Sequence, residues 1–307
     1  MKILFIDIVH PFLKKELEKK NHICDIAYNK TRDEILSIIL DYEGIVLRSR
    51  IKIDYDFLNK CQGLKFIARA GSGLENIDVI EAKKRNIKCF NAPEGNRQAL
   101  AEHALGMLLS LFNNLNKSDQ EVRKGIWERE NNRGIELSGK TIGIIGFGNN
   151  GSALAEILSG FGVRILAYDK YLDNYPYKSN MRTIFQQANI LSLHIPLTSE
   201  TTYLVDKDYI KRFEKPIYII NTARGKCVNT KDLVSAMKNG KVLGACLDVL
   251  EYEKTSFEDL ERKELITELQ YIFDSEKTIL SPHIAGWTKQ SKLRIAEVLF
   301  QKINLIN

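Results

Sequence analysis

Three side chains that could transfer protons or bind anions follow three apolar runs in the second half of the chain. Arg224 follows the run PIYII, Glu253 comes shortly after GACLDV, and His283 follows TIL. Histidine suits general acid–base catalysis, arginine can hold a carboxylate, and a carboxylate can orient the histidine. Taken singly, each residue would more often be an ordinary surface or turn residue. Because all three lie just beyond strand ends, where ligands bind in doubly wound sheets, together they predict a functional site.

The run TIGIIGFGNNG predicts a phosphate-binding turn between a strand and a helix. In its G-x-G-x-x-G spacing, Gly146 makes the tight turn, Gly148 lets a pyrophosphate approach the backbone, and Gly151 lets the helix pack on the strand. Asp169 ends the next strand pattern, where a carboxylate can accept hydrogen bonds from an adenosine ribose and repel the extra phosphate of NADP. The alternative is a glycine-rich turn in some other α/β protein. The order strand, loop, helix, strand and acid favours a site for NAD.

The other histidines compete for the acid–base role. His194 ends the run ILSLH close to the expected cofactor crevice, and we expect it to be structural or to contact the cofactor. His103 interrupts a strongly apolar helix pattern and is expected to be a satisfied core residue. His10 and His22 lie near predicted element ends and have ordinary surroundings. His283 is therefore the candidate proton donor.

Short apolar runs alternate with helix patterns on both sides of the glycine loop, which predicts parallel sheets covered by helices. The expected strands are 3–8, 22–28, 44–47, 64–70, 87–91, 141–145, 164–168, 190–194, 217–220, 243–248 and 278–280, and the expected helices are 12–20, 31–40, 76–85, 98–115 and 230–239. The apolar helix at 98–115 should be buried between domains or subunits. The polar stretch 116–138 is expected to cross between domains, and 252–277 to form a surface helix.

Composition limits the classes of protein and partner. The 307 residues allow about two domains, and the net charge of +6 comes from basic residues interleaved with acids. Without a run of five like charges, a nucleic-acid or membrane-binding patch is not expected. The five cysteines lack metal or redox spacing, so no metal site is expected. With a strand-like start, MKILFIDI, and no apolar span, the chain is expected to be cytoplasmic.

These motifs are similar to those of one known family. The chain resembles the D-isomer-specific 2-hydroxyacid dehydrogenases over essentially its whole length. The matching segments are LRSR (47–50), LKFIARAGSGLENID (64–78), NAPEGN (91–96), AEHALGMLL (101–109), ELSGKTIGIIGFGNNG (136–151), LSLHIPLT (191–198), NTARG (221–225), GACLDVLEYE (244–253) and SPHIAGW (281–287). The resemblance implies two doubly wound parallel-sheet domains. One is a flavodoxin-like substrate domain of residues 1–97 plus 284–307, and the other is a Rossmann NAD-binding domain of residues 98–283.

The resemblance also implies roles for the residues at the strand ends. His283 would be the acid–base, Glu253 would pair with it, and Arg224 would bind the carboxylate and carbonyl of a small anionic 2-hydroxy or 2-oxo acid. The nicotinamide carboxamide would be held by Asp248 and by the backbone of Thr222 and Ala223. The apolar helix would help to form a homodimer.

Within the family the segments look most like the D-3-phosphoglycerate dehydrogenase branch, in a short form without a C-terminal regulatory domain. This implies oxidation of 3-phosphoglycerate to 3-phosphohydroxypyruvate, in serine biosynthesis. The implied substrate contacts are Arg48, Ser49, Arg69, Ser72 and Gly73. Arg50 could contact the substrate or could equally be a surface ion-pair partner.

Two alternatives remain open. One is a glyoxylate/hydroxypyruvate or D-lactate-type reductase, and the other is an NAD(H)-sensing binding protein or corepressor. The chain also departs from the family pattern. Asn149 and Asn150 replace the more common Arg-Ile of the glycine loop and should alter a pyrophosphate contact without abolishing binding. Ile51 stands where Thr or Ser is frequent, and Lys254 follows Glu253 in place of proline.

Overall fold

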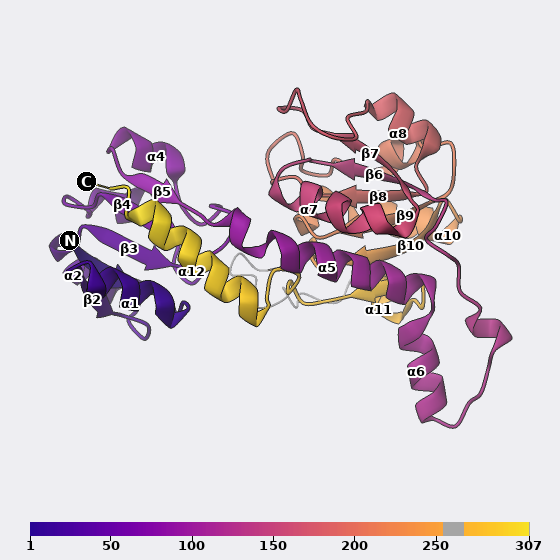
Figure 1. The fold of residues 1–307 in the computed structure, drawn as a ribbon, viewed down its shortest axis with the longest axis horizontal. Helices are drawn as coiled ribbons and strands as arrows, with labels where there is room; N and C mark the ends of the chain where they lie inside the picture. Colours follow the sequence, from indigo (N-terminus) through magenta and orange to yellow (C-terminus); the bar gives the residue numbers. More distant parts are fainter. Residues whose placement is uncertain (254–266, 307) are drawn as a thin grey trace. The chain divides into compact units, whose positions relative to one another are not determined.

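The computed structural model describes residues 1–253 and 267–306, which form two compact units. The first unit comprises residues 1–97 and 287–306, and the second comprises residues 98–253 and 267–286. Each unit is built around one sheet whose strands all pair in parallel, with helices on both faces (Figure 1). The predicted fold class, two parallel-sheet α/β domains, is confirmed.

The first unit has the strand order β2-β1-β3-β4-β5, which is the flavodoxin-like order. Its central strands are apolar except for Lys2 at the start of β1 and Arg69 at the end of β4, because helices cover them on both sides. The strands are β1 (Lys2–Phe5), β2 (Ile23–Ile26), β3 (Gly44–Leu47), β4 (Phe66–Arg69) and β5 (Lys88–Phe90).

Two helices from opposite ends of the chain cover one face of this sheet. Leu13 of α1 (Pro11–Lys19) and Leu299 of α12 (Lys289–Ile303) share a buried core with Phe5. The other face is covered by α2 (Arg32–Ile38), α3 (Tyr55–Asn59) and α4 (Val79–Lys84). The first unit is therefore completed by the C-terminal segment.

The second unit has the strand order β11-β10-β9-β8-β6-β7. Lys178 forms an isolated parallel bridge to Ala167 of β7, so a one-residue strand extends that edge. Counting this bridge, the order is 3-2-1-4-5-6-7, the Rossmann arrangement with one more strand. The strands are β6 (Thr141–Ile145), β7 (Arg164–Tyr168), β8 (Ile190–Leu193), β9 (Ile217–Asn221), β10 (Val242–Leu247) and β11 (Thr278–Leu280). The direction of winding reverses between β6 and β8, and ligands bind at such switch points.

Helices cover both faces of the second sheet as well. The apolar helix α5 (Pro93–Phe112) and α7 (Asn149–Leu158) share one core, so the apolar face of α5 from Ala101 onward packs on the sheet of its own unit. The opposite face is covered by α8 (Met181–Gln187), α9 (Lys207–Lys211), α10 (Thr230–Lys238) and α11 (Thr267–Asp274).

The stretch 116–138 is not the crossing between domains, and this prediction was wrong. The units divide between Arg97 and Gln98, and residues from Leu115 form helix α6 (Leu115–Arg123) in the second unit. The sequence concealed α6 because the helix is polar on most sides and buries none of its residues. A surface helix was also predicted at 252–277. Of this range, residues 254–266 lie outside the described part of the chain, and the described part is helical at α11.

Among the described residues, no helix is both long and apolar enough to span a membrane.

Candidate functional site

The glycine loop follows β6 directly, and its three glycines have different environments. Gly146 has a φ of 88°, and a Cβ atom added there would lie 2.5 Å from the carbonyl oxygen of His194. A Cβ on Gly151 would overlap the carbonyl oxygen of Gly146. Gly148 caps α7, and a Cβ there would meet nothing within 4 Å. The first and third glycines are therefore required by packing, whereas Gly148 leaves open space where a phosphate could approach.

Asp169 lies beside this loop, at the end of β7. Its Oδ2 accepts a hydrogen bond from the amide of Phe147 at 2.8 Å, and its Oδ1 accepts from the amides of Tyr171 and Leu172 at 2.9 and 3.1 Å. The carboxylate therefore ties the glycine loop to the next strand end. It occupies the place where a ribose contact was predicted.

Three predicted cofactor-binding residues carry buried polar atoms without a partner. These atoms are Oδ1 of Asn150, Nδ1 of His194 and Oγ1 of Thr222, out of eight such atoms in the described residues. Buried polar atoms are nearly always hydrogen-bonded, so an unpaired one points to a missing partner. The three residues follow β6, β8 and β9, which are neighbours at the switch point of the sheet. This donor and acceptor set fits a dinucleotide such as NAD.

His194 is unsuited to proton transfer at neutral pH. Its Nε2 lies 2.8 Å from the Oγ of Ser192, and burial lowers the pKa of His194 to about 4. The imidazole is therefore neutral under ordinary conditions, and its place next to Gly146 favours a cofactor contact.

His283 and Glu253 lie within hydrogen-bonding distance. Nδ1 of His283 is 2.8 Å from Oε2 of Glu253, while Oε1 of Glu253 accepts from the amide of Leu250 at 2.5 Å. The backbone of His283 is left-handed, with a φ of 55°, which is uncommon for a residue other than glycine. Such strain persists only where surrounding contacts impose it, and it gathers at functional sites.

Asp248 holds the loop on both sides of His283. The carboxylate is 1% exposed, and its Oδ1 accepts from the hydroxyl of Ser281 at 2.6 Å and the amide of Ile284 at 2.8 Å. Its Oδ2 accepts from the amide of Ala285 at 2.9 Å. The sequence predicted a nicotinamide contact for Asp248; in the structure its carboxylate anchors the loop that carries His283.

Ser281 and His103 belong to the same hydrogen-bonded group as Asp248, and sequence reasoning assigned neither of them to the site. His103, expected to be a core residue of α5, has Nε2 2.8 Å from the hydroxyl of Ser281 and 3.6 Å from Oδ1 of Asp248. Only the apolar helix around His103 drew attention to it, and no spacing in the sequence links it to Ser281, 178 residues later.

Arg224 follows β9 at the same edge of the sheet. Its Nη1 donates to the carbonyl of Ala223 at 2.6 Å, and Thr222 and Ala223 are both buried. A Cβ on Gly225 would overlap the carbonyl oxygen of Leu250, so the loop of Arg224 packs closely on the loop that leads to Glu253. Because β9, β10 and β11 are neighbours, the loops of Arg224, Glu253 and His283 follow adjacent strand ends.

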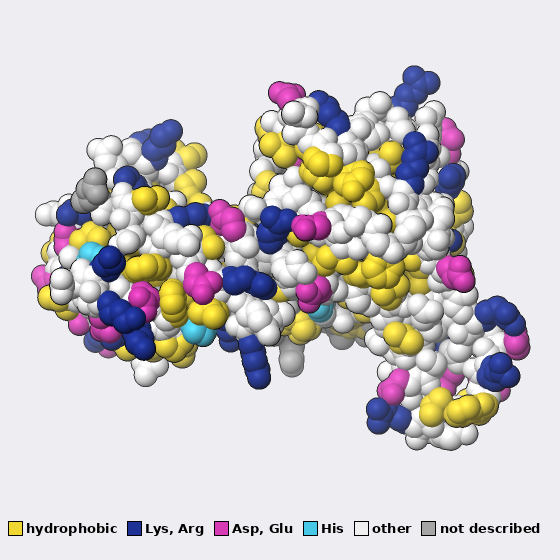
Figure 2. Space-filling model, viewed as in Figure 1, with side chains coloured by type: hydrophobic (Ala, Val, Ile, Leu, Met, Phe, Trp, Pro, Cys, Tyr) yellow, Lys and Arg dark blue, Asp and Glu magenta, His cyan; other side chains and the backbone are white. Residues whose placement is uncertain are grey.

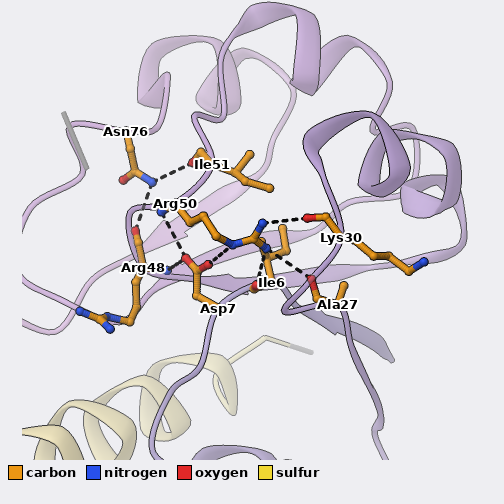
Figure 3. Close-up of polar contacts among 8 residues, drawn as sticks. All are labelled: Ile6, Asp7, Ala27, Lys30, Arg48, Arg50, Ile51 and Asn76. Carbon is orange, nitrogen blue, oxygen red and sulfur yellow. Dashed lines mark hydrogen bonds and ion pairs between the residues drawn. The ribbon is translucent and has the colours of Figure 1, made fainter. Parts of the chain in front are cut away.

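In the first unit, Arg50 is fully engaged within the fold. Its Nε donates to Oδ1 of Asp7 at 2.9 Å, and its Nη atoms donate to the carbonyls of Lys30, Ile6 and Ala27 at 2.7, 2.6 and 3.3 Å (Figure 3). Every nitrogen of this guanidinium has an acceptor. Arg50 is thus a structural ion-pair partner, and the structure removes it from the candidate substrate contacts.

The guanidinium of Arg48 points away from this network (Figure 3). It lies over the indole of Trp287, 4.3 Å from the ring centroid, while its amide donates to Oδ2 of Asp7 at 2.6 Å. Ser49 lies between the two arginines in the loop after β3. The loop fixed by Asp7 therefore carries Arg48 with its guanidinium against Trp287.

The remaining predicted substrate contacts follow β4. Nε of Arg69 donates to the carbonyl of Arg48 at 3.3 Å, and Gly71 leaves room for the guanidinium, because a Cβ there would lie 2.5 Å from Nη1. The hydroxyl of Ser72 donates to Oδ1 of Asn96 at 2.7 Å, and Gly73 is the next residue of that loop. The structure thus gathers these residues at the carboxyl ends of β3 and β4.

Comparisons with known proteins agree with this geometry. Residues 105–285 match the family model of the D-isomer specific 2-hydroxyacid dehydrogenase, NAD binding domain. The chain is 34% identical over 275 residues to a hydroxypyruvate reductase of Thermotoga maritima, covering 89% of this chain and 87% of that protein. It is 30% identical over 309 residues to a D-3-phosphoglycerate dehydrogenase of Archaeoglobus fulgidus, covering 99% of this chain but only 56% of that protein.

A solved structure is also similar. The D-lactate dehydrogenase from Aquifex aeolicus, complexed with NAD and lactic acid, superimposes with a TM-score of 0.83 at 27% identity, covering 99% of this chain and 94% of that one.

Proposed function

Because the chain belongs to the D-isomer specific 2-hydroxyacid dehydrogenase family, we propose that it oxidises 3-phosphoglycerate to 3-phosphohydroxypyruvate with NAD. We propose that this reaction serves serine biosynthesis in the cytoplasm. The chemistry shared by the family is assigned to the second unit, and the choice of substrate to the first.

In the proposed reaction, His283 takes the proton from the substrate hydroxyl, and Glu253 holds the imidazole in position through Nδ1. Arg224 holds the substrate carboxylate. When bound, NAD supplies the acceptor for the hydride that leaves the hydroxyl-bearing carbon. The glycine loop, Asp169 and the unpaired polar atoms of Asn150, His194 and Thr222 would hold it.

The observation that carries the choice of 3-phosphoglycerate is the state of Arg48. A phosphorylated acid has two anionic groups and needs a cation besides Arg224. The guanidinium of Arg48 forms no ion pair with a carboxylate in the described part of the chain and stacks on Trp287. It is therefore available for a phosphate, whereas Arg50 is not.

Hydroxypyruvate or glyoxylate reduction is the second candidate within the same chemistry, and a D-lactate-type reaction is a variant of it. It is favoured by the engagement of Arg50 with Asp7, which leaves the first unit with one cation fewer for a phosphate. The relative from Thermotoga maritima carries the name hydroxypyruvate reductase.

Steady-state rates decide between these candidates. We expect 3-phosphoglycerate to give the highest kcat/KM among 3-phosphoglycerate, D-glycerate and D-lactate with NAD. With NADH, we expect 3-phosphohydroxypyruvate to exceed hydroxypyruvate, glyoxylate and pyruvate. A strong preference for an unphosphorylated acid would contradict the proposed substrate and leave the dehydrogenase chemistry intact.

A binding protein that senses NAD(H) is the candidate from another class. It shares the glycine loop but would turn over none of these acids. NAD binding measured by calorimetry, together with the absence of turnover, would identify it.

We also propose that the protein is a homodimer that pairs through the arm formed by α6 and the residues that follow it. In Figure 1 this arm extends from the remainder of the second unit, and Figure 2 shows hydrophobic side chains on its surface. The exposed apolar side chains there are Leu115, Val122, Ile126, Trp127 and Ile135. Exposed apolar surface of this kind marks an interaction site. Light scattering should give a dimer for the wild type and a monomer for Trp127→Asp.

A further inference from the structure

We propose that Trp287 is the platform of an anion-binding site in the first unit, with Arg48 and Lys292 as its two cations. The guanidinium carbon of Arg48 lies 4.3 Å from the centroid of the indole ring, and Nζ of Lys292 lies 5.0 Å from it. Attraction to the ring holds cations at this range. Two positive charges are thus kept on one small area of surface by a single side chain.

Among the described residues, no carboxylate neutralises this pair. Neither Arg48 nor Lys292 forms an ion pair with Asp or Glu within residues 1–253 and 267–306. Lys292 also lies near the start of α12, whose first turn contains no acidic residue. A lysine there is repelled by the positive end of the helix as well as by Arg48. An anion bound between the cations would relieve both repulsions.

The site rests on exposed groups that a ligand can reach. The Trp287 side chain is 52% exposed, and Lys292 is exposed. The backbone beneath Arg48 is fixed, because its amide is bound to Asp7 and its carbonyl accepts from Arg69 and Asn76. Arg48 is therefore presented from a fixed loop, and Lys292 from the first turns of helix α12.

The chemistry favours a phosphate over a single carboxylate. A phosphate dianion has enough oxygens to bind both cations at once, and such charge-assisted bonds are stronger than neutral ones. Resting on the proposed function, the assignment is that the Trp287 platform holds the phosphate of the substrate. Trp287 is then a positioning residue and Lys292 a specificity determinant.

Variants of the platform test this assignment by substrate preference. We expect Lys292→Gln and Trp287→Leu to lower the ratio of kcat/KM for 3-phosphoglycerate to that for D-glycerate by about tenfold. Lys289→Gln is the matched control, since it removes a charge from the same helix end. Among the described residues no cation–π interaction joins Lys289 to the indole, so this variant should leave the ratio unchanged. Equal ratios in the wild type, Lys292→Gln and Trp287→Leu would overturn the proposal.

A binding measurement separates the site from the proposed reaction. The chain has two tryptophans, so Trp127→Phe leaves Trp287 as the only indole. Inorganic phosphate should then change its fluorescence saturably, with an apparent Kd raised about tenfold by Lys292→Gln. If the protein oxidised only unphosphorylated acids but showed this response, the proposed substrate would fail and the anion site would stand. No response to phosphate would overturn the site, even if 3-phosphoglycerate were oxidised.

Discussion

Nδ1 of His283 lies 2.8 Å from Oε2 of Glu253, and the imidazole belongs to a residue with left-handed backbone. Two separate contacts maintain this pair. Glu253 orients the ring, while the buried carboxylate of Asp248 holds the loop around it through three hydrogen bonds. The proposed chemistry therefore depends on residues from the ends of β10 and β11 that act together.

Replacing His283 by Asn should remove activity and preserve the fold. Asn tolerates the left-handed conformation, so thermal stability should be close to that of the wild type. Without the acid–base, kcat should fall by about 100- to 10,000-fold. His283→Ala is the paired variant, with the same loss of kcat and a stability lower by about 1 kcal/mol. Activity retained in His283→Asn would show that another group transfers the proton.

Asp248→Asn should destabilise the loop that carries His283. Both carboxylate oxygens accept hydrogen bonds, and an amide nitrogen in place of either one would face a donor. The unfolding free energy should fall by about 2 to 4 kcal/mol, with a larger fractional loss of kcat than of NAD affinity. Chemical denaturation and isothermal titration measure the two effects. Loss of NAD binding at unchanged stability would instead support the nicotinamide contact predicted from the sequence.

Two glycines of the glycine loop should differ in their roles, Gly148 in NAD binding and Gly151 in packing. Gly148→Ala should fold with nearly unchanged stability, because its Cβ meets nothing within 4 Å, and should weaken NAD binding. Gly151→Ala should lower stability, since its Cβ overlaps the carbonyl of Gly146. Thermal melts with and without NAD distinguish the two. Equal NAD-induced shifts in wild type and Gly148→Ala would exclude the predicted phosphate approach.

Replacing Arg50 should lower the stability of the protein, whereas replacing Arg48 should weaken substrate binding. Arg50→Met leaves the buried carboxylate of Asp7 without its ion pair and should cost about 2 to 3 kcal/mol of stability. Arg48→Met should change stability little and raise the KM for 3-phosphoglycerate selectively. Urea titrations measure the stability of both variants, and steady-state kinetics with 3-phosphoglycerate and D-glycerate measure substrate binding. A selective rise in the KM for 3-phosphoglycerate in Arg50→Met would contradict these assignments.

Stability should decline as the pH falls from about 6.5 toward 4, because burial lowers the pKa of His194 to about 4. In this window the unfolded chain binds a proton that the folded chain does not, so unfolding is favoured by up to about 3 kcal/mol. Carboxylates with a lowered pKa, such as Glu43, also reduce stability as the pH falls, but only below about 4.5, their ordinary pKa. His22, also lowered by burial, acts in the same direction as His194.

Denaturant unfolding at several pH values checks this against His194→Gln, which should show a shallower decline. Identical pH profiles for the two proteins would rule out His194 as the source.

Much of the fold could be predicted because its signals are local. The strand at Gly44–Leu47 was predicted at its observed bounds, and the helix predicted from residue 31 begins at the cap Thr31. The short helices α3, α8 and α9 were missed, although the capping residues Asp54, Asn180 and Asp206 precede them. Helix α6 carries little apolar pattern and could not be distinguished from a loop.

The site was harder to predict where it depends on contacts between distant residues. Arg48 and Arg50 lie two residues apart in the same loop, and the sequence does not distinguish their roles. Only the fold brings Asp7 to the guanidinium of Arg50 and Trp287 to that of Arg48. Likewise, Asp248 lies 33 residues from Ser281, and nothing local links the two. Such pairings are set by tertiary packing.

The central claim is that this chain transfers hydride between NAD and a D-2-hydroxy acid with His283 as the acid–base. Its most direct test is NADH formation by purified protein with 3-phosphoglycerate, D-glycerate and D-lactate, alongside their L-enantiomers and the His283→Asn variant. We predict turnover of D-acids only, highest with 3-phosphoglycerate, and its loss in the variant. Tight binding of NAD without turnover of any 2-hydroxy acid would contradict the account.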